Sequence, residues 1–593
     1  MTELYINNRP AWLPTDFSIA LTSENPYFTS SSAYSLDIDL PMPENIGIFG
    51  HIHRLDVGKQ KTILPARLVA GARTLLNGSA VLLSISDEVA RVQLVSGNAE
   101  LNILTNEDIY IDELDLGTVP DPDYYGDRAW KPAADKPLYF GSVDQVDAVW
   151  MPVAYDGSSG NRLMNLTLYQ FGTDAFKLVP VYGERCVQPY LLAVVRRLVE
   201  HFGYTLDEGF FDGNFLRNVY ICNAVSTRKV ARALPHWTVS EFFDELERFL
   251  MAVTVVDELT KTVRLVPLND YFREDDLNII PATDVLTEYE AEIDEDGGDK
   301  NLTDGNVGYD LPSHTDNGYL RMDRTIYDRA LKQDYDDYTL LSRAWQEMDA
   351  ELRKTVLFRA GNRCYINYRD EEGTDSLKEV NLYADLVRDA DRADTDTALR
   401  IVPAEMVMHN IGLWSSPTDY GFVSPFAPLN VYVPKVGYHV TVIEDEEFDI
   451  QQAIEGEVEL PEKQEKNTVM EVAFSTGEWV TMNVTYQGQT YPWQYALPFT
   501  DYALKPANQT TGFRPYSLSL QDICADSLGR RLSALKVFRS NIPYTISFLS
   551  DRLPDVNKVF LIANKKYLCE KIEASVTHDG LDRVMKGTFY RIE

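Results

Sequence analysis

The sequence predicts a β-dominated α+β protein that is built from several domains. Residue types that favour strands alternate with polar residues near the N-terminus, and they return in the last segment of the chain. Two stretches stand out against this background because they combine helical periodicity with recognisable ends. With 593 residues and 45% hydrophobic content, the chain is too long for one core, so roughly three to five domains are expected.

Residues 1–117 are predicted to form an N-terminal β-domain. Within AYSLDIDLPMPEN, apolar and polar residues alternate with the period of a half-buried strand. The apolar face of this predicted strand consists of Tyr34, Leu36, Ile38 and Leu40. The pair Asn77-Gly78 lies between two apolar runs and predicts a type I′ hairpin turn, because both residue types tolerate positive φ. Residues 118–188 follow as a linker, which includes PDPDYYGD at 120–127, and a β-rich segment.

Residues 189–310 are predicted to form an α+β domain with two helices and a hairpin. The first helix, in QPYLLAVVRRLVEHFG, begins beside Pro189 and ends at Gly203, which suits a C-terminal glycine cap. The second helix follows Thr238, whose spacing to Glu241 is that of a capping box. Its apolar face consists of Val239, Phe242, Phe243, Leu246, Phe249 and Leu250.

A β-hairpin is predicted directly after the second helix, with strands at Met251–Val256 and Thr262–Pro267. A helix and a hairpin that adjoin in sequence can shield each other's apolar faces from water. We therefore interpret the two elements as a local packing unit rather than as a site.

Two regions complete the chain. Residues 311–470 hold a helix-like stretch at 323–353, long enough to link two parts of the molecule, and a mixed domain with an acidic excursion at 441–467. A further acidic stretch at 282–305 is interpreted, like the excursion, as a solvated loop. Residues 471–593 are predicted to form a C-terminal β-domain. The turn pairs predicted near its end are Asn564-Lys565 and Asp579-Gly580.

Charge and composition exclude several classes of function. Lys and Arg total 55 against 91 Asp and Glu, and the net charge of −36 opposes general affinity for phosphate backbones or anionic membranes. No secretion signal and no run of about eighteen apolar residues is found. The cysteines are odd in number and far apart, so we expect no disulfide framework and synthesis in a reducing cytoplasm. They are Cys186, Cys222, Cys364, Cys524 and Cys569.

Metal binding has three weak candidates in the sequence. His51 and His53 would point to one face of a strand, but no partner at a recognisable spacing accompanies them, and ordinary strand or turn residues are favoured. The run from Asp294 to Asp299 does not fit a calcium loop, because Asp299 and Gly305 stand where an EF-hand needs Gly and Glu. The aspartates at 389–397 lack a glycine turn and are interpreted as a solvated loop.

Signs of catalysis are equally sparse. No phosphate loop, dinucleotide fingerprint, nucleophile elbow or HExxH helix occurs. A carboxylate pair for glycoside hydrolysis meets in space rather than in sequence, so 91 acids make any chosen pair uninformative. The aromatic stretch at 484–499 suits sugar stacking, but core packing is favoured. We predict no enzyme, no cofactor, and no catalytic, cofactor-binding or metal-ligating residue.

Several segments together resemble tail proteins of phages and prophages, in particular the hub of the baseplate or tail tip. The N-terminal segments are FSIALTSENPYFTSSSAYSLDIDLPMPEN, GARTLLNGSAVLLSIS and VQLVSGNAELN. The C-terminal segment is YLCEKIEASVTHDGLDRVMKGTFYRIE, and SEFFDELERFLMAVTVVDELTKTVRLVPL resembles the small α+β insert of such hubs. Residues from about 355 to 540 carry no such resemblance.

The resemblance implies antiparallel β-barrel tube domains with helix-plus-hairpin inserts on their outside. It implies a homo-oligomer, a trimer, that joins the tail tube to the tip and lines the path of ejected DNA without binding it specifically. The implied partners are the tail tube, the distal tail ring and the tip or spike, and the implied location is the virion. We expect residues 1–117 and a second β-domain after residue 355 to contribute to one ring, because closure removes strand edges.

Two other functions stay open. One is a tail-associated carbohydrate-binding or depolymerase protein, which saccharide turnover by a monomer would support. The other is a distal tail ring or another virion connector. Oligomeric state separates the hub from the enzyme most directly.

Overall fold

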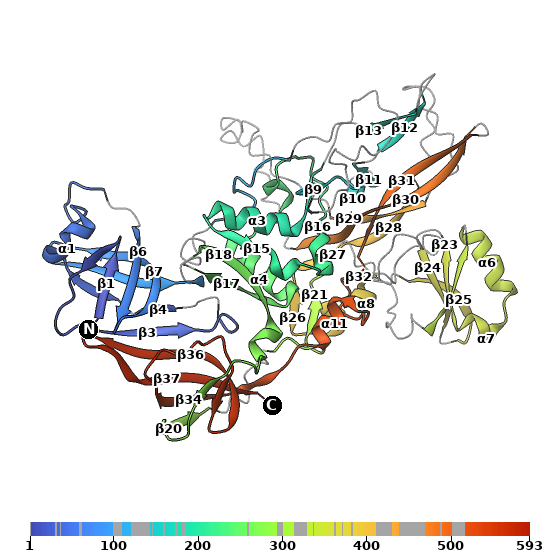
Figure 1. Ribbon diagram of the computed structural model, residues 1–593. Helices are drawn as coiled ribbons and strands as arrows, with labels where there is room; N and C mark the ends of the chain where they lie inside the picture. The colour runs from blue at the N-terminus through green and yellow to red at the C-terminus, as the bar shows by residue number, and fades with distance from the viewer. Residues whose placement is uncertain are drawn as a thin grey trace, which may run out of the picture.

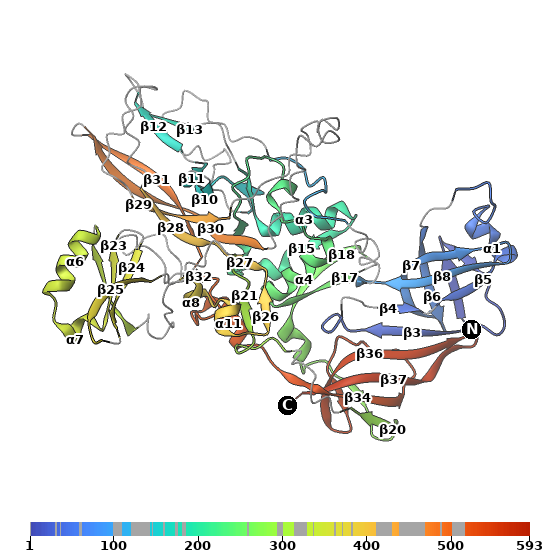
Figure 2. The ribbon, with the colours of Figure 1, turned by 180° about the vertical axis from the view of Figure 1, so that it is seen from behind.

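The computed structural model of the chain confirms a β-dominated α+β protein with several sheets and short helices (Figure 1). It describes residues 2–592 except for 30–32, 36, 59–61, 99–108, 120–142, 145, 158–159, 166, 172–175, 181–185, 258–259, 293–300, 313–328, 336, 361–362, 371, 381–382, 411–429, 438–468, 487–488 and 501–515. The N-terminal strands, the central helices and a small sheet with two helices follow one another across the molecule in both views (Figures 1 and 2). Among the described helices, none is long and apolar enough to cross a membrane.

The largest sheet joins strands from both ends of the chain. Its order is β2-β1-β6-β7-β8-β4-β3-β36-β37-β34-β20, with β5 beside β8, β35 beside β36, and β19 beside β35. Its first strands are β1 (Thr2–Ile6), β2 (Arg9–Ala11), β3 (Ser18–Glu24), β4 (Ala33–Ser35), β5 (Ile38–Pro41), β6 (Ile63–Ala70), β7 (Arg73–Ile85) and β8 (Val89–Ser96). Its later strands are β19 (Asn278–Ile280), β20 (Val285–Ala291), β34 (Phe538–Leu549), β35 (Phe560–Ile562), β36 (Lys565–Thr577) and β37 (Gly580–Ile592). The junction is the antiparallel pair of β3 and β36, which lie side by side in Figure 1, and Leu21 is opposite Ala574 in this pair.

This sheet is open, so the closed β-barrels that the resemblance implied are not found in the described part of the chain. The path of paired strands ends at β2 and at β20, each of which pairs with one strand among the described residues. A physical reason lies in β3. One edge of β3 pairs with β4, and its other edge is occupied by β36 rather than by an N-terminal strand that would close a barrel.

The hairpin turn predicted at Asn77-Gly78 is wrong. Strand β7 runs straight through this pair, in the middle of its pairing with β6. The turn lies at Gly71 and Ala72, whose φ angles of 56° and 65° suit a type I′ turn. Gly78 is needed for another reason, because a Cβ atom there would lie 2.2 Å from the carbonyl oxygen of Val95 on β8.

The strand predicted around residues 34–40 is divided into β4 and β5, which both pair with β8. Ile38 and Leu40 are buried as predicted, whereas Tyr34 is only half-buried and Ser35 takes the buried position beside it. The hydroxyl oxygen of Ser35 accepts a hydrogen bond from the Leu94 amide at 3.0 Å. Because of this break, the buried side chain of β4 comes from an odd-numbered position, Ser35, whereas those of β5 come from even-numbered positions, Ile38 and Leu40. Helix α1 (Met42–Phe49) follows β5 directly.

The two predicted helices are confirmed. Helix α3 (Leu191–His201) is followed by Gly203 at a φ of 82°, as a glycine cap requires. Helix α4 (Val239–Leu250) begins with a complete capping box: the Glu241 amide donates to Thr238 Oγ1 at 3.1 Å, and the Thr238 amide donates to Glu241 Oε2 at 2.8 Å. Met251, with a φ of 52°, ends this helix in the left-handed conformation.

The predicted hairpin is confirmed as well, and it packs beside α4. Its strands are β17 (Ala252–Asp257) and β18 (Thr262–Pro267), and β15 (Thr205–Asp207) pairs with the outer edge of β18. Every residue of the predicted apolar face of α4 is buried: Val239, Phe242, Phe243, Leu246, Phe249 and Leu250. The largest core cluster contains these residues together with those of α3 and of the neighbouring strands. The segment is thus a packed α+β unit, as the sequence indicated.

The single linking helix predicted at 323–353 is wrong in the part that the structure describes. Strand β22 (Leu331–Tyr335) occupies the middle of this stretch, followed by α6 (Tyr338–Glu347) and α7 (Ala350–Arg353). Asp337 and Asp349 explain the division, because their carboxylates accept hydrogen bonds from backbone amides in the first turns of α6 and α7. These elements form a small unit with β23 (Val356–Ala360), β24 (Arg363–Arg369) and β25 (Asp375–Val380), in the order β22-β23-β24-β25.

The remaining strands form smaller sheets and pairs. One four-stranded sheet contains β10 (Val153–Gly157), β11 (Gly160–Met164), β28 (Glu405–Asn410) and β29 (Asn430–Val436). Another contains β16 (Val219–Ile221), β27 (Ile401–Pro403), β30 (Met470–Tyr486) and β31 (Gln489–Phe499). Paired short strands are β9 (Ala148–Val149) with β14 (Gln188–Pro189), β12 (Thr167–Phe171) with β13 (Phe176–Pro180), β21 (Val307–Tyr309) with β26 (Thr397–Leu399), and β32 (Tyr516–Ser517) with β33 (Asp526–Ser527). The short helices are η1 (Glu208–Phe211), η2 (Phe215–Asn218), η3 (Ala231–Ala233), η4 (Leu268–Phe272), α8 (Tyr383–Val387), α9 (Ala390–Ala393) and α11 (Leu528–Ser533).

Both hairpins predicted near the C-terminus exist, with small shifts. The first turn lies at Ala563 and Asn564, one position before the predicted pair, and both residues have positive φ. The second joins β36 to β37, and Gly580 is the first residue of β37.

The acidic stretch at 282–305 is not a loop throughout, because β20 lies within it and pairs with β34. The division of the chain into five domains stays a prediction.

Candidate functional site

A small polar cluster lies where α4 begins. The segment after Ile109 runs antiparallel to the residues that precede this helix. Val239 N donates to the carbonyl oxygen of Ile109 at 3.0 Å, and Ile111 N donates to that of Trp237 at 2.9 Å. This short ladder places Asp112 beside His236, although 124 positions separate them in the sequence.

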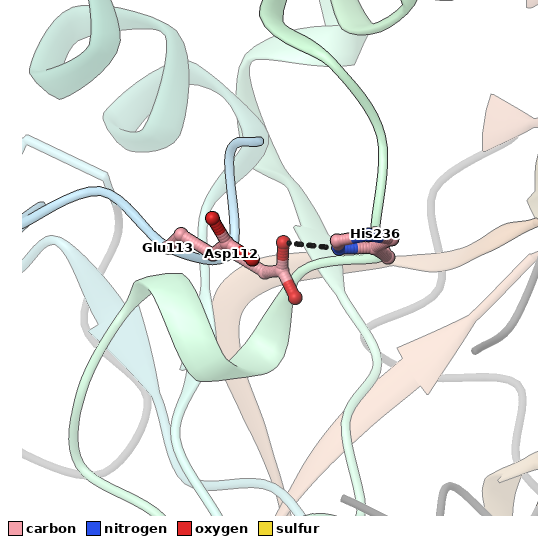
Figure 3. A group of neighbouring side chains, drawn as sticks. All are labelled: Asp112, Glu113 and His236. Atoms are coloured by element: carbon pink, nitrogen blue, oxygen red, sulfur yellow. Dashed lines mark hydrogen bonds and ion pairs between the residues drawn. The ribbon is translucent and has the colours of Figure 1, made fainter. Parts of the chain in front are cut away.

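The side chains of the cluster are Asp112, Glu113 and His236 (Figure 3). Asp112 Oδ1 lies 3.0 Å from His236 Nδ1, and one ligand atom from each of the three residues falls within 4.8 Å of the others. The Tyr110 ring stacks on the imidazole with a centroid distance of 3.8 Å and an interplanar angle of 8°. Asp112 is 9% exposed, whereas Glu113 is exposed.

The donor set of this cluster suits a divalent metal chemically. One imidazole and two carboxylates are ligands that transition metals accept, with bonds of about 2.1 Å to nitrogen. The same contacts also have a structural role. The His236–Asp112 contact and the Tyr110 stack hold the chain that leads into α4, and this role requires no ion. Among the described residues, this is the one group of three or more such side chains with that spacing.

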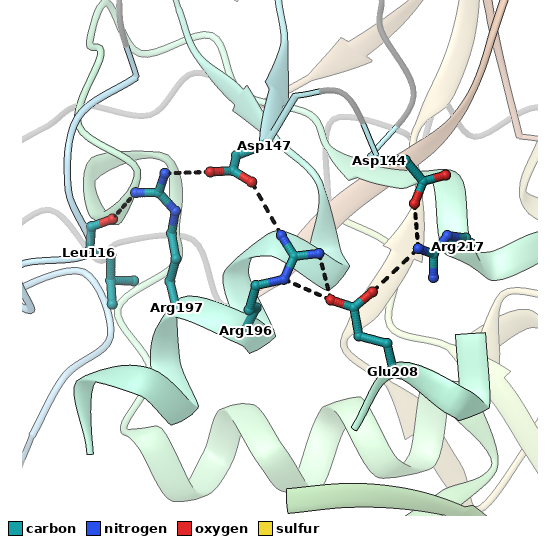
Figure 4. A network of polar contacts seen from close by, with 7 residues as sticks. All are labelled: Leu116, Asp144, Asp147, Arg196, Arg197, Glu208 and Arg217. Carbon is teal, nitrogen blue, oxygen red and sulfur yellow. Dashed lines mark hydrogen bonds and ion pairs between the residues drawn. The ribbon is translucent and has the colours of Figure 1, made fainter. Parts of the chain in front are cut away.

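A network of ion pairs surrounds α3 (Figure 4). Arg196 Nε donates to Glu208 Oε1 at 2.8 Å, and Arg197 Nη2 donates to Asp147 Oδ2 at 2.6 Å. Arg196 Nη1 also reaches Asp147 Oδ1 at 3.3 Å. Arg217 on η2 continues the network by pairing with Glu208 at 3.3 Å and with Asp144. Adjacent arginines on α3 thereby hold the segment before β9 and the 3-10 helices η1 and η2.

Arg197 extends this network to the N-terminal part of the chain. Its Nη1 donates to the carbonyl oxygen of Leu116. The next residue, Gly117, has a φ of 82°, and a Cβ atom there would lie 2.6 Å from the same Nη1. The hydrogen bond with Asp144 raises the pKa of Arg217, so this guanidinium stays charged. The charges in the network are paired, which is typical of a structural clamp rather than of a catalytic site.

Two carboxylates of α4 lie in an unusual environment. Glu245 is 4% exposed, pairs with Arg248 Nη1 at 3.0 Å, and accepts a hydrogen bond from the Arg400 amide at 3.1 Å. Glu247 accepts a hydrogen bond from the Thr254 amide of β17 at 2.7 Å. Burial raises the pKa of both carboxyl groups, that of Glu247 to about 7. Glu245 connects α4 to Arg400, between β26 and β27, and Glu247 connects α4 to β17, so their contacts are those of packing.

The metal candidates weighed from the sequence are not brought together. His51 and His53 lie in a turn after α1 rather than on a strand, with ring centroids 6.1 Å apart. The run from Asp294 to Asp299 lies outside the described residues. The stretch at 389–397 was predicted to be a loop, but it contains α9, because Asp389 accepts a hydrogen bond from the Asp391 amide and caps this short helix. The described residues of the aromatic stretch at 484–499 lie on β30 and β31.

Sequence reasoning missed Asp112, Glu113 and His236 because no local pattern connects them. The signal that is present in the sequence is the helix start at Thr238, which fixes where His236 must lie. It gives no information about which distant segment pairs with that start.

Comparisons with known proteins were made by sequence and by structure. No family model and no curated protein matches the chain. A solved structure that is similar is the crystal structure of the 43 kDa tail protein of prophage MuSo2 from Shewanella oneidensis. The sequence identity is 6% over 99% of this chain and 96% of that chain, and the TM-score is 0.28. A likeness at this TM-score does not establish a shared fold.

Proposed function

We propose that the chain is a structural protein of a phage or prophage tail, which acts as an oligomeric hub at the tail tip or baseplate. In this role it joins the tail tube to the tip, contacts other tail proteins, and surrounds the path of the ejected DNA. It carries out no chemistry of its own. The segmental resemblance to tail hub proteins suggests this role, and one feature of the sheet supports it.

That feature is the open edge at β20. Strand β20 pairs with β34 on one side, and among the described residues no strand pairs with its other side. Tyr289 on this strand is 71% exposed. An unpaired edge of this length presents backbone donors and acceptors that a strand of another chain can meet. A second copy of the chain that adds a strand here extends the sheet between subunits, as a ring requires.

The charge of the chain is compatible with the proposed role. A net charge of −36 disfavours tight binding of DNA, because the phosphate backbone is attracted to cations. A subunit whose ring surrounds moving DNA benefits from weak attachment. The same charge disfavours an acidic polysaccharide as substrate.

Oligomeric state tests the proposal. Sedimentation velocity of the purified chain is expected to show a closed oligomer, a trimer, whose interfaces bury roughly 2,000 Å² or more each, as obligate assemblies do. Electron microscopy of the same sample is expected to show rings. A chain that stays monomeric at micromolar concentration contradicts the hub.

An edge variant tests which strand forms the interface. Tyr289→Lys places a charge on the β20 edge and is expected to shift the oligomer towards monomers. Leu55→Lys introduces the same charge at a residue that is 101% exposed and away from this edge, and it serves as the matched control. An equal effect of both variants contradicts an interface at β20.

The depolymerase alternative is tested separately. The purified chain is expected to leave peptidoglycan and capsular polysaccharide intact, as measured by the release of reducing sugars. Release that is lost when one Asp or Glu is changed would replace the structural proposal by an enzymatic one.

A further inference from the structure

A cleft of about 740 Å³ lies between the central α+β unit and the C-terminal strands. Phe210 of η1, strand β18 and Tyr271 of η4 supply apolar walls, while Arg531 of α11 and the loop at 555–558 contribute polar groups. The cleft is independent of the clusters shown in Figures 3 and 4, because none of its lining residues belongs to Asp112, Glu113 and His236 or to the ion pairs of α3. It therefore requires its own explanation.

Arg531 is the unusual residue of this cleft. Its guanidinium carbon lies 5.2 Å from the Phe210 ring centroid and 5.9 Å from that of Phe215. Its Nη1 atom is buried and has no hydrogen-bond partner within the part of the chain that the structure describes. Burial lowers the pKa of this arginine, which makes no ion pair with a carboxylate among the described residues. In a chain with 91 acids, a half-buried arginine without such a partner is a distinctive feature.

The other cations of the cleft help to define its ligand. Lys558 pairs with Asp276, and Arg273 lies 3.6 Å from Asp275. Arg264 also lines the cleft and makes no ion pair with the described residues. Two arginines are thus available to an anion, and Arg531 is the more buried of the two.

Acidic residues limit the charge of that anion. Five aspartates line the same cleft: Asp207, Asp270, Asp275, Asp276 and Asp555. Negative charges near a site repel a dianion more strongly than a monoanion. A monoanion with a planar oxygen pair matches the guanidinium fork of Arg531, whereas a phosphate dianion or a nucleic-acid backbone is disfavoured. The apolar walls favour a ligand that carries a hydrophobic body next to its charge.

We propose that this cleft binds a carboxylate group attached to an apolar body, with Arg531 as the residue that holds the carboxylate. The ligand is either a free C-terminal carboxylate or an acidic side chain beside an apolar residue, and both share this chemistry. Since the lining comes from β18, α11 and the loop before β35, a bound ligand connects the central unit to the C-terminal strands. This inference does not rest on the proposed tail function.

Calorimetric titration of the full-length chain tests the proposal with defined probes. N-acetylphenylalanine carries the carboxylate and an apolar ring, and N-acetylphenylalaninamide has the same shape without the charge. Saturable binding of the acid and none of the amide is expected. Inorganic phosphate is expected to bind more weakly than the acid. Phosphate that binds more tightly overturns the carboxylate assignment.

The source of the carboxylate is distinguished by two peptides. One is acetyl-Ala-Ala-Phe with a free C-terminus, and the other is acetyl-Ala-Glu-Phe with an amidated C-terminus. Binding of the first alone assigns a chain terminus, and binding of the second assigns an acidic side chain. Binding of neither peptide overturns the inference.

Variants localise the site. Arg531→Gln is expected to weaken binding of N-acetylphenylalanine by roughly ten- to a hundredfold, because a charged hydrogen bond is lost. Arg530→Gln is the matched control, since Arg530 is the exposed neighbour on the same helix and does not line the cleft. Equal affinities of the two variants overturn the proposal.

Two milder variants keep the test valid if Arg531→Gln fails to fold. Arg531→Lys retains the charge but loses the planar fork, and an intermediate affinity is expected. Asp270→Asn removes one negative charge from the cleft and is expected to tighten binding. Affinities that both variants leave unchanged contradict a carboxylate held by Arg531.

Discussion

The side-chain amide of Asn25 donates a hydrogen bond of 2.9 Å to the backbone carbonyl of Cys569, 544 positions later in the chain. The same amide group also donates to the carbonyl oxygen of Val556 at 3.0 Å. Asn25 is 1% exposed and follows the last residue of β3. One buried side chain thus holds the junction at which the two ends of the chain form one sheet.

We predict that Asn25→Ala destabilises this junction. The change leaves two buried carbonyl groups without their donor, which costs about 1–3 kcal/mol for each. Urea unfolding measures the loss, and hydrogen exchange of β3 and β36 localises it. Asn278→Ala is the control, because it removes a hydrogen bond to Asp555 in an exposed setting and should change stability by about 0.5 kcal/mol or less. Equal effects of the two changes would contradict a special role for Asn25.

We predict that Phe249→Ala destabilises the α+β unit by about 3–5 kcal/mol, through lost burial and the cavity that remains. Phe249 is fully buried in the largest core cluster. Hydrogen exchange over α4, β17 and β18 should report faster opening. Ile279→Ala, at a residue that is 67% exposed, is the apolar control. An unchanged unfolding midpoint for Phe249→Ala would mean that this face is not part of the core.

Gly78→Ala should disrupt the N-terminal strands. A Cβ atom at this position meets the carbonyl oxygen of Val95 at 2.2 Å, so β7 and β8 must separate, at a cost of about 1–3 kcal/mol. Gly58→Ala places the same methyl group where no atom lies within 4 Å and should be nearly neutral. Thermal unfolding of the two variants compares them directly.

Glu247 should make stability depend on pH. Burial raises its pKa to about 7 from a reference value of 4.5. Between these values the folded chain binds more protons than the unfolded chain, so the contribution of Glu247 is full below the unfolded pKa and is lost as the pH rises through the folded pKa. Glu247→Gln cannot ionise, and it should therefore be more stable than the parent chain near pH 8, with a smaller difference near pH 5.

The control for this prediction is Glu347→Gln, which removes one negative charge at an exposed position. Urea unfolding at both pH values gives the two differences. A difference for Glu247→Gln that does not vary with pH would show that the carboxyl group is not held in its protonated form.

Local signals in the sequence predicted the central helices well. The capping box at Thr238 and the glycine at position 203 are decided by the nearest residues, so α3 and α4 begin and end as expected. The stretch at 323–353 has helical periodicity too, but Asp337 and Asp349 act as new caps and divide it. Propensity alone does not distinguish an acid on the surface of a helix from an acid at its start.

Contacts between distant segments could not be predicted from the sequence. Gly78 suits a turn by its residue type, yet its role depends on Val95, which becomes its neighbour only when β7 and β8 pair. The Asp112–His236 contact depends on tertiary packing in the same way, and so does the position of Arg531 beside Phe210. The pairing of β3 with β36 is the largest feature of this kind, and neither strand carries a local sign of its partner.

The junction of β3 and β36 has a consequence for synthesis on the ribosome. When β3 leaves the ribosome, the strand that will cover its second edge lies more than five hundred residues behind it. At about 5–20 residues per second, that edge waits for roughly half a minute to two minutes. During this time an unpaired strand is open to pairing with other nascent chains on the same messenger. Chaperones that hold exposed strands, or a slow start of N-terminal folding, are therefore expected to raise the yield of soluble protein in cells.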